Sequence, residues 1–503
     1  MTKKILFRLD VLGIHFGIAK YIQEDFNHKI SAIIDVNNGK TFYQKQKIVN
    51  FENIWFFGDS LKNIKKQPDL VYLKYIESKY KINLWKLAYG DQLFFQYNDY
   101  YQFTDNEILC ILENACKFYE NVLNELNPDY LFIRLTDNSV DHLLSLMCHA
   151  KRIPVFTFSF SRLGNRYSLL NKYDQFDAVD DISYTAPKDR TLEELREYVI
   201  NYSLDQQKFR KVFRTSKLNW LMGGLKYLKI TSSPNYTKYY KYHGRTLLKA
   251  FYNELGFYLK RKFRKSFIDK HLDRKIDTTS PFVYFPLQAE PERTLLISAP
   301  FYANQLELIT NIARSLPPNF LLYVKEHPFQ KVKGWREISK YKQIMDLPNV
   351  KLIHPSVSNM DLIAKSELVL TITGNSALES ALNNKPSVIF SDTIFSELSC
   401  VYRVLDITNL SSIISNALKT KIVVSEINNF IFKLEENSFD FHERTDLEAQ
   451  LNNQFHYGGF LLDTEYSEED VDRFLKENES VFKKLSFEHN KKIVKLESFS
   501  NSI

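Results

Sequence analysis

At 503 residues the chain is too long for one hydrophobic core, so its length predicts at least two domains. Hydrophobic residues at 44% and charged residues at 25% are typical of a soluble globular protein. No apolar run approaches the roughly 18 residues of a membrane span, so we expect no membrane-spanning helix.

The N-terminal stretch and the cysteines bear on the compartment. Arg8 and Asp10 stand where a signal peptide would be apolar, so we expect no secretory signal. The four cysteines form no CxxC pair and no zinc spacing, and few, unpatterned cysteines are typical of a reducing compartment. We therefore expect a cytoplasmic protein.

Residues 1–185 alternate short apolar runs with helical patterns. We predict strands at 4–9, 31–36, 53–57, 129–135 and 154–160, and helices that include 112–126 and 139–150. A glycine-marked turn with Gly13 and Gly17 follows the first strand. Strands that alternate with helices predict a parallel sheet covered on both faces, so this region is expected to be a Rossmann-like domain.

Residues 186–276 predict a mostly helical segment that is basic and aromatic. Residues 205–275 hold 19 Lys or Arg against 4 Asp or Glu, a net charge of +15 in a chain of +7, so the remaining residues sum to −8. Basic residues interleaved with Tyr and Phe suit an anionic membrane surface or a phosphorylated lipid carrier. The other interpretation is a solvated helical insertion. No nucleic-acid-binding motif accompanies the charge, so no nucleic acid partner is expected.

From residue 277 the alternation resumes. Strands are predicted at 282–287, 294–300, 320–325, 350–354, 368–373 and 387–390, with helices at 304–316 and 376–382. This pattern predicts a second Rossmann-like domain over 277–420, followed by a helical tail, 421–503, that packs back toward the first domain. The predicted fold class is α/β, with a cleft between two domains where open α/β sheets bind ligands.

Polar residues end one predicted strand of the second half abruptly. After Leu321–Val324 the chain continues Lys325-Glu326-His327-Pro328. Pro328 fixes the backbone and favours an extended His327, so the imidazole points in one direction. An imidazole N–H at a strand end could donate to a phosphate and stabilise a departing group, and Lys325 could add positive charge. The alternative is an ordinary turn.

The second stretch is 368-LVLTITGNSALES-380, in which Gly374 turns a strand into a helix. Backbone N–H groups at the helix start can bind phosphate. Three short polar side chains could assist them, those of Thr373, Asn375 and Ser376. Glu379 follows one turn later, where a carboxylate could accept the hydroxyls of a ribose. The alternative is a plain capped helix with Glu379 in solvent; the two stretches together favour one anion site.

A third group of polar residues lies in loops at the start of the second half. Its members are Gln288, Glu290, Glu292 and Gln305. The carboxylates could be acid and base groups, or they could cap a helix or loop. Both interpretations stay open from the sequence.

These residues carry a resemblance. FPLQAEPE, ANQLELI, LPPNFLLYVKEHP and LVLTITGNSALESALNNKP resemble the bacterial capsule and surface-polysaccharide biosynthesis glycosyltransferases, a group of GT-B-like enzymes. The resemblance covers residues 280–395 and, more loosely, NPDYLFIRL and PVFTFSFSRLGNRY in the first half. The nearest relatives that can be named are the capsule-type transferases of 3-deoxy-manno-octulosonic acid (Kdo). More distantly, bacterial sialyltransferases share a His-Pro motif that engages the phosphate of a CMP-sugar.

The resemblance implies a GT-B-like fold, with the nucleotide donor on the second domain and the acceptor on the first. His327 would be the catalytic residue of the His-Pro motif. The donor side would comprise Lys325, Glu326, Pro328, Thr373, Gly374, Asn375, Ser376, Glu379, Gln288, Glu292 and Gln305. Because fixed donors and a helix dipole would meet the charge of the leaving phosphate, neither a metal nor a cofactor is expected beyond the nucleotide-sugar co-substrate.

The general base is not supplied by the resemblance. Sialyltransferases have an acidic pair followed by glycine in the N-terminal half, and this sequence has none. The catalytic candidates left are Asp137 and Asp141, and Asp137 is favoured because it directly follows a predicted strand. The acceptor side would further include His15, Gly13, Arg134 and His142.

We therefore predict a metal-independent glycosyltransferase that moves a sugar from a nucleotide donor, such as a CMP-Kdo-like one, to a surface or capsular polysaccharide acceptor. If the basic segment binds lipid, the protein would be peripheral on the inner face of the cell membrane. The alternatives are a teichoic-acid-type polyol-phosphate transferase that uses a CDP-polyol, a catalytically silent glycan-binding subunit, and a nucleotide-sugar epimerase.

Overall fold

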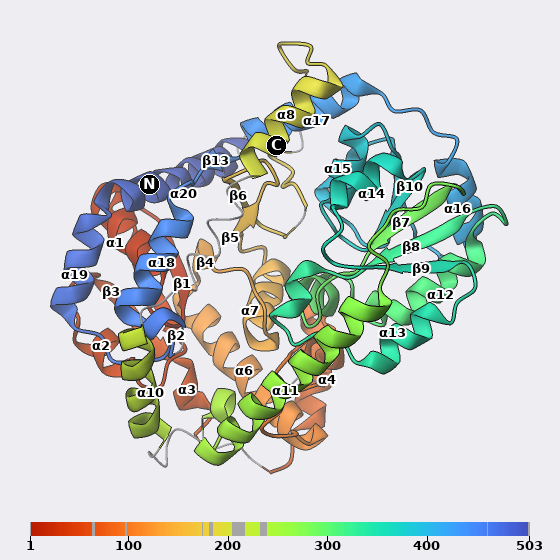
Figure 1. Ribbon diagram of the computed structural model, residues 1–503. Helices are drawn as coiled ribbons and strands as arrows, with labels where there is room; N and C mark the ends of the chain where they lie inside the picture. Colours follow the sequence, from red (N-terminus) through yellow and green to blue (C-terminus); the bar gives the residue numbers. More distant parts are fainter. Residues whose placement is uncertain are drawn as a thin grey trace. The chain divides into compact units, whose positions relative to one another are not determined.

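The computed structural model describes residues 2–62, 66–95, 98–173, 175–180, 185–203, 217–231, 239–459 and 461–500. The chain forms two compact units (Figure 1). Unit 1 comprises residues 1–182, 202–250 and 437–503, and unit 2 comprises residues 183–201 and 251–436. The predicted basic segment, 186–276, is shared between the units, and its residues 204–216 and 232–238 lie outside the described residues. The end of the predicted tail, from 437 onward, belongs to unit 1.

The described part of unit 1 holds a seven-stranded sheet in the order β13-β6-β5-β4-β1-β2-β3. Its strands are β1 (Lys4–Leu9), β2 (Lys29–Ile34), β3 (Phe51–Phe56), β4 (Tyr130–Ile133), β5 (Val155–Phe160), β6 (Arg166–Leu170) and β13 (Phe439–Asp440). The first five are parallel, whereas β6 and β13 extend the sheet as antiparallel strands. The parallel part agrees with the predicted strands, and β6 and β13 were not predicted.

Helices cover both faces of this sheet because its strand residues are apolar on both sides. Phe7 packs into a core with the N-terminal helix and the C-terminal helices, while its neighbour Leu6 packs into a second core on the other face. The helices are α1 (Ile14–Phe26), α2 (Lys40–Lys45), α3 (Phe57–Ser60), α4 (Leu70–Tyr80), α5 (Leu84–Tyr89), α6 (Asp105–Leu126), α7 (Ser139–Ala150), α10 (Lys217–Thr231), α18 (Arg444–Phe455), α19 (Glu468–Glu477) and α20 (Glu479–Ser500).

The C-terminal helix α20 packs directly on α1 (Figure 1). Gly17 lies inside α1 rather than in a turn, and a Cβ there would approach the Phe482 ring of α20 to 2.3 Å. The glycine thus lets the two helices come close, and the rings of Tyr21 and Phe482 stack beside it with centroids 6.1 Å apart. Distant parts of the chain therefore build one core.

The described part of unit 2 holds a six-stranded parallel sheet in the order β12-β11-β10-β7-β8-β9. The strands are β7 (Phe282–Pro286), β8 (Leu321–Lys325), β9 (Val350–Ile353), β10 (Leu368–Thr371), β11 (Ser387–Ile389) and β12 (Val401–Arg403). The helices of this unit are α8 (Leu192–Ser203), α11 (Leu247–His271), α12 (Gln305–Ser315), α13 (Ile338–Met345), α14 (Asn359–Lys365), α15 (Ser376–Leu382), α16 (Leu410–Ala417) and α17 (Val424–Glu436), of which α8 and α11 begin or end in unit 1.

Residues on both faces of the unit 2 sheet are buried. Val283 and Phe285 of β7 pack toward α12, α13 and α16, and Tyr284 between them packs toward α14. The predicted α/β class with two Rossmann-like halves is therefore confirmed, because each unit has a sheet that is mainly or wholly parallel and is enclosed by helices.

The strand predicted at 294–300 is wrong. Thr294–Ser298 forms a short π-helical turn, and Leu295 packs into the core beside the sheet. Strand β7 already has β10 and β8 on its two sides, so the segment that follows it finds no free edge beside it. A short apolar run does not by itself distinguish a strand from a buried helical turn. Among the described residues, no helix has the length and apolar character needed to cross a membrane.

Candidate functional site

The carboxyl ends of β10, β7 and β8 lie side by side in unit 2, because these strands are neighbours in a parallel sheet. The loops after them carry Gly374, Gln288 and His327. The structure thus brings the two predicted stretches to one edge of one sheet, which is where such sheets bind ligands.

Glu326 is fully buried and holds the His-Pro loop in place. Its Oε2 accepts from Arg336 Nε at 3.0 Å and from the Tyr341 hydroxyl at 2.6 Å. Its Oε1 accepts from the backbone N–H of His327 at 2.6 Å. All of these partners belong to the protein, so Glu326 positions His327 and is not directed at a ligand.

The imidazole of His327 is neutral with a defined tautomer. Its Nδ1 accepts from the backbone N–H of Phe329 at 3.2 Å, so Nε2 carries the ring proton. Burial, and after it the positive charges of Arg336 and Lys325, lower the pKa of His327 to about 4. At neutral pH the ring is therefore an uncharged N–H donor.

Lys325 and Glu379 form a poorly compensated pair of ionisable groups. The Lys325 ammonium donates to Asn359 Oδ1, and that oxygen also accepts from the Tyr284 hydroxyl at 3.1 Å. Burial lowers the pKa of Lys325 to about 8, although the Glu379 carboxylate opposes the shift. Burial likewise raises the pKa of Glu379, with Lys325 opposing. Within the described residues, the Glu379 carboxylate has no hydrogen bond of its own.

Gly374 marks a close approach between the turn and the sheet. Its N–H donates to Thr371 Oγ1 at 3.1 Å, and a Cβ on it would lie 2.6 Å from that oxygen and 3.2 Å from Gln288 Nε2. The Thr373 hydroxyl is buried and has no partner in the described part of the chain. Asn375 precedes α15 without a side-chain cap, and Ser376 is buried at the first position of this seven-residue helix.

The third predicted group braces the loop after β7. Gln305 accepts from Gln288 N at 2.8 Å and donates to Glu290 Oε1 at 2.6 Å. Arg336 also pairs with Glu290, at 2.6 Å. Burial raises the pKa of the remaining carboxyl, that of Glu292. Gln305 and Glu290 are thus committed to protein partners, which favours the loop-capping interpretation for them.

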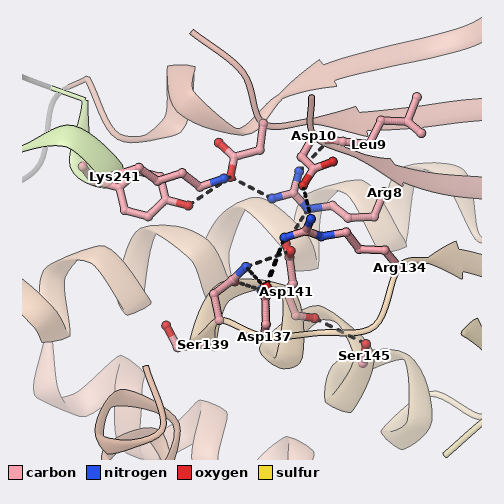
Figure 2. A network of polar contacts seen from close by, with 12 residues as sticks. Arg8, Leu9, Asp10, Arg134, Asp137, Ser139, Asp141, Ser145 and Lys241 are labelled. Atoms are coloured by element: carbon pink, nitrogen blue, oxygen red, sulfur yellow. Dashed lines mark hydrogen bonds and ion pairs between the residues drawn. The ribbon is translucent and has the colours of Figure 1, made fainter. Parts of the chain in front are cut away.

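In unit 1 the ends of β1 and β4 carry an exposed ion-pair group (Figure 2). Arg134 NH1 lies 3.1 Å from Asp10 Oδ2, and NH2 lies 3.2 Å from Asp137 Oδ1. The side chains of Arg134 and Asp137 are 44% and 52% exposed. Asp137 therefore stands at the sheet edge in solvent, as its position after the strand predicts.

Behind this group lies a buried network that sequence reasoning missed (Figure 2). Arg8 of β1 pairs with Asp141 at 2.7 Å and with Asp35, at the end of β2, at 2.9 Å. Lys241 adds a second pair to Asp35 at 2.7 Å. Burial alone would raise the pKa of Asp35 and of Asp141, but the cations outweigh it and lower both. Asp141 is hence a committed ion-pair partner, and Asp137 is the more accessible of the two predicted carboxylates.

The remaining acceptor-side residues surround the start of α1 and α7. Gly13 precedes α1, and His15 lies in its first turn with a buried Nε2 that has no partner among the described residues. Burial, followed by the charges of Arg134 and Arg444, lowers the pKa of His15 to about 4. His142 lies in α7, with its Nδ1 3.4 Å from the Thr136 hydroxyl.

Four residues of the two sheet edges were missed as site residues: Asp10, Asn359, Arg336 and Arg8. Asp10 could have been found, because it directly follows a predicted strand just as Asp137 does. The other three gave no signal, since their partners are distant in the sequence.

The comparison with protein families gives one match over the site. Residues 198–398 match the family described as capsule polysaccharide biosynthesis protein. This matched segment covers about two fifths of the chain. It contains the whole sheet-edge group of unit 2, from Gln288 to Glu379, so the resemblance predicted from the sequence is confirmed at the level of the family.

The three solved structures that follow resemble this chain only distantly, and no curated protein matches the chain. The Thermosulfurimonas dismutans KpsC beta Kdo 2,4 transferase is 10% identical with a TM-score of 0.32, covering 64% of this chain and 87% of that one. The beta Kdo 2,7 transferase of the same KpsC is 12% identical with a TM-score of 0.29, covering 62% and 79%. The UDP-GlcNAc 2-epimerase of Methanocaldococcus jannaschii is 14% identical with a TM-score of 0.25, covering 86% and 99%.

Proposed function

We propose that the protein is a glycosyltransferase of capsule or surface-polysaccharide synthesis, which takes a sugar from a nucleotide donor bound at the carboxyl edge of the unit 2 sheet. One observation carries the proposal. In the segment that matches the capsule family, Lys325, His327 and Glu379 gather at one sheet edge with shifted pKa values and few protein partners. Such groups are typical of a binding or active site.

The chemistry assigned to this edge follows from the state of each group. His327 presents Nε2–H to a phosphate oxygen of the donor, and Lys325 supplies a positive charge when it is protonated. Both stabilise the negative charge that grows on the nucleotide as the glycosidic bond to it breaks. Glu379 accepts hydrogen bonds from hydroxyl groups of the nucleotide. In this proposal the departing phosphate is met by side-chain donors, and neither a metal nor a further cofactor takes part.

The acceptor hydroxyl must lose a proton as the new bond forms. We assign this step to the unit 1 sheet edge, where Asp137 is exposed beside Arg134, with the neutral His15 as the other base. The acceptor is a growing glycan, and the site works at the inner face of the cell membrane. A CMP-Kdo-like sugar is the donor that the family resemblance favours.

The test is thermal stabilisation of the purified protein by CMP, CDP, UDP, GDP and their sugar conjugates, because a ligand that binds the folded state raises its apparent stability. The same series is run on His327→Ala and on His354→Ala. His354 is a matched control at the end of the neighbouring strand β9, but its ring nitrogens contact Ser356 and Asp269. We expect one nucleotide class to stabilise the wild type and the control, and to lose its effect in His327→Ala.

Transfer assays with that donor should fall by a factor of about 10²–10³ in His327→Ala, as when one donor to a developing charge is removed. Wild-type turnover in this variant would contradict the role of His327. Nucleotide binding without transfer to any glycan, but with interconversion of the sugar, would identify an epimerase instead. A product that retains phosphate would identify a polyol-phosphate transferase, and no nucleotide binding at all would leave a silent glycan-binding subunit.

A further inference from the structure

Helix α11 exposes a large apolar surface. Seven apolar or aromatic side chains of its unit 2 part are exposed. Phe257 is only 38% exposed, and the other six are Phe251, Tyr252, Leu255, Tyr258, Leu259 and Phe263. Phe251, Tyr252 and Phe263 are 64%, 67% and 71% exposed, although aromatic side chains of this size are normally mostly buried. Single exposed apolar residues need no explanation, but a contiguous group of this kind marks an interaction surface.

The six side chains lie on one face of the helix. Phe251, Leu255 and Tyr258 are spaced i, i+4 and i+7, and Tyr252, Leu259 and Phe263 follow the adjacent row of the helix surface. Other positions hold the helix to unit 2: Arg264 donates to the Trp335 carbonyl at 2.8 Å, and Ile268 and Leu272 enter the core. The anchoring contacts thus leave the apolar face uncovered by its own unit.

Basic residues lie among and beside these side chains. Helix α11 contains seven Lys or Arg and two Asp or Glu, and Lys260, Arg261, Lys262 and Lys265 are clustered in one turn and a half. Among the described residues, Lys265 forms an ion pair only with the exposed Asp269, at 3.7 Å. A helix that combines exposed aromatic residues with a basic cluster has the chemistry of an interfacial helix, which buries its apolar face among acyl chains while its cations meet lipid phosphates.

We propose that α11 docks on the surface of an anionic lipid bilayer, with Phe251–Phe263 inserted at the interface and the cluster of Lys260–Lys265 on the headgroups. A second copy of the chain is the other occupant, and a twofold contact with the two helices parallel is disfavoured because it would bring two basic clusters together. Nucleic acid would satisfy the cations but would leave the apolar face exposed. The docking assigns a surface to the membrane location of the proposed function, but it does not depend on the sugar transfer.

The test is sedimentation of the full-length protein with vesicles of phosphatidylcholine, alone or mixed in equal amounts with phosphatidylglycerol, at rising salt. We expect binding to the mixed vesicles at low salt that weakens as salt screens the charges. Lys260→Glu/Lys262→Glu/Lys265→Glu should reduce partitioning by at least about a hundredfold, because each basic residue near an anionic surface contributes about a fivefold factor. Phe251→Ser/Tyr258→Ser/Phe263→Ser should abolish binding at all salt concentrations.

A matched control replaces exposed apolar residues of another helix. Leu70, Val71 and Tyr75 of α4 are 62%, 82% and 53% exposed, so Leu70→Ser/Val71→Ser/Tyr75→Ser removes similar apolar area elsewhere. This control should sediment like the wild type, and all variants should keep the wild-type melting temperature and nucleotide response. Three results would overturn the proposal: no binding at low salt, an equal loss in the α4 control, or a dimer in lipid-free solution that becomes monomeric in the Phe251 triple variant.

Discussion

The polar edges of the two sheets differ in how completely their charges are paired. In unit 1, Arg8 is surrounded by the carboxylates of Asp35 and Asp141, and these carboxyl pKa values are lowered despite burial. In unit 2, burial dominates: the pKa of Lys325 falls to about 8 and the pKa of Glu379 rises. Removing one partner of a fully paired buried charge is costly, whereas a buried group whose pKa is shifted against its charged form is available to a ligand that completes its pairing.

The largest effect should come from breaking the buried ion-pair network at the sheet edge of unit 1. Arg8→Met leaves Asp35 and Asp141 buried without their shared cation, so we expect the free energy of unfolding of unit 1 to fall by about 3–5 kcal/mol. Denaturant unfolding and, separately, calorimetry measure this change in the free energy of unfolding. Arg134→Met is the control, because Arg134 is 44% exposed and its pairs with the partly exposed Asp10 and the exposed Asp137 should contribute less than about 1 kcal/mol. Equal losses in both variants would remove the distinction between a buried and an exposed network.

A second variant adds a methyl group to the tightly packed turn after β10 in unit 2. Gly374→Ala places a Cβ 2.6 Å from Thr371 Oγ1, on a strand that cannot move freely. The free energy of unfolding of unit 2 should therefore fall by about 1–3 kcal/mol, and nucleotide affinity should fall as well. Thr371→Ala/Gly374→Ala removes the clashing oxygen and should recover most of the loss. Gly256→Ala in α11 has no atom within 4 Å of the new Cβ and should not destabilise the protein. If Gly374→Ala melted and bound nucleotide like the wild type, this turn would not be tightly packed.

The smallest effect should be the pH dependence of nucleotide affinity that arises from Lys325. Lys325 is protonated below its pKa of about 8, so affinity for the nucleotide should decrease as pH rises through 8, by at most about tenfold per pH unit. Calorimetric titration between pH 7 and pH 10 with the nucleotide that stabilises the protein measures this. Lys325→Met should abolish the dependence. Glu379→Gln should move it to lower pH, because the Glu379 carboxylate raises the pKa of Lys325. A flat wild-type profile would exclude Lys325 from the phosphate site.

Much of the fold was predictable because hydrophobic patterns report strands that are buried on both faces. The parallel strands β1 to β5 and β7 to β11 lie where apolar runs predict them. The short strands β6, β12 and β13 were missed. Strands β12 and β13 are edge strands of three and two residues, too short to leave a pattern of their own, and β6 is a five-residue strand between β13 and β5. The run at 294–300 shows the opposite failure. Its apolar residues are buried, but both sides of the preceding strand β7 are already occupied by β10 and β8, so the run does not join the sheet.

The sequence by itself determined that His327 and Gly374 follow strands of one parallel sheet, and hence that they meet at its carboxyl edge. That follows from local order, because parallel strands all end at the same side. Only the tertiary structure decided which charged groups are held in ion pairs within the protein and which remain accessible. Asp137 and Asp141 are equivalent candidates in the sequence, but Asp141 lies next to Arg8, 133 residues away, whereas Asp137 stays in solvent. Partnership and burial depend on distances between remote residues, and these distances exist only once the chain has folded.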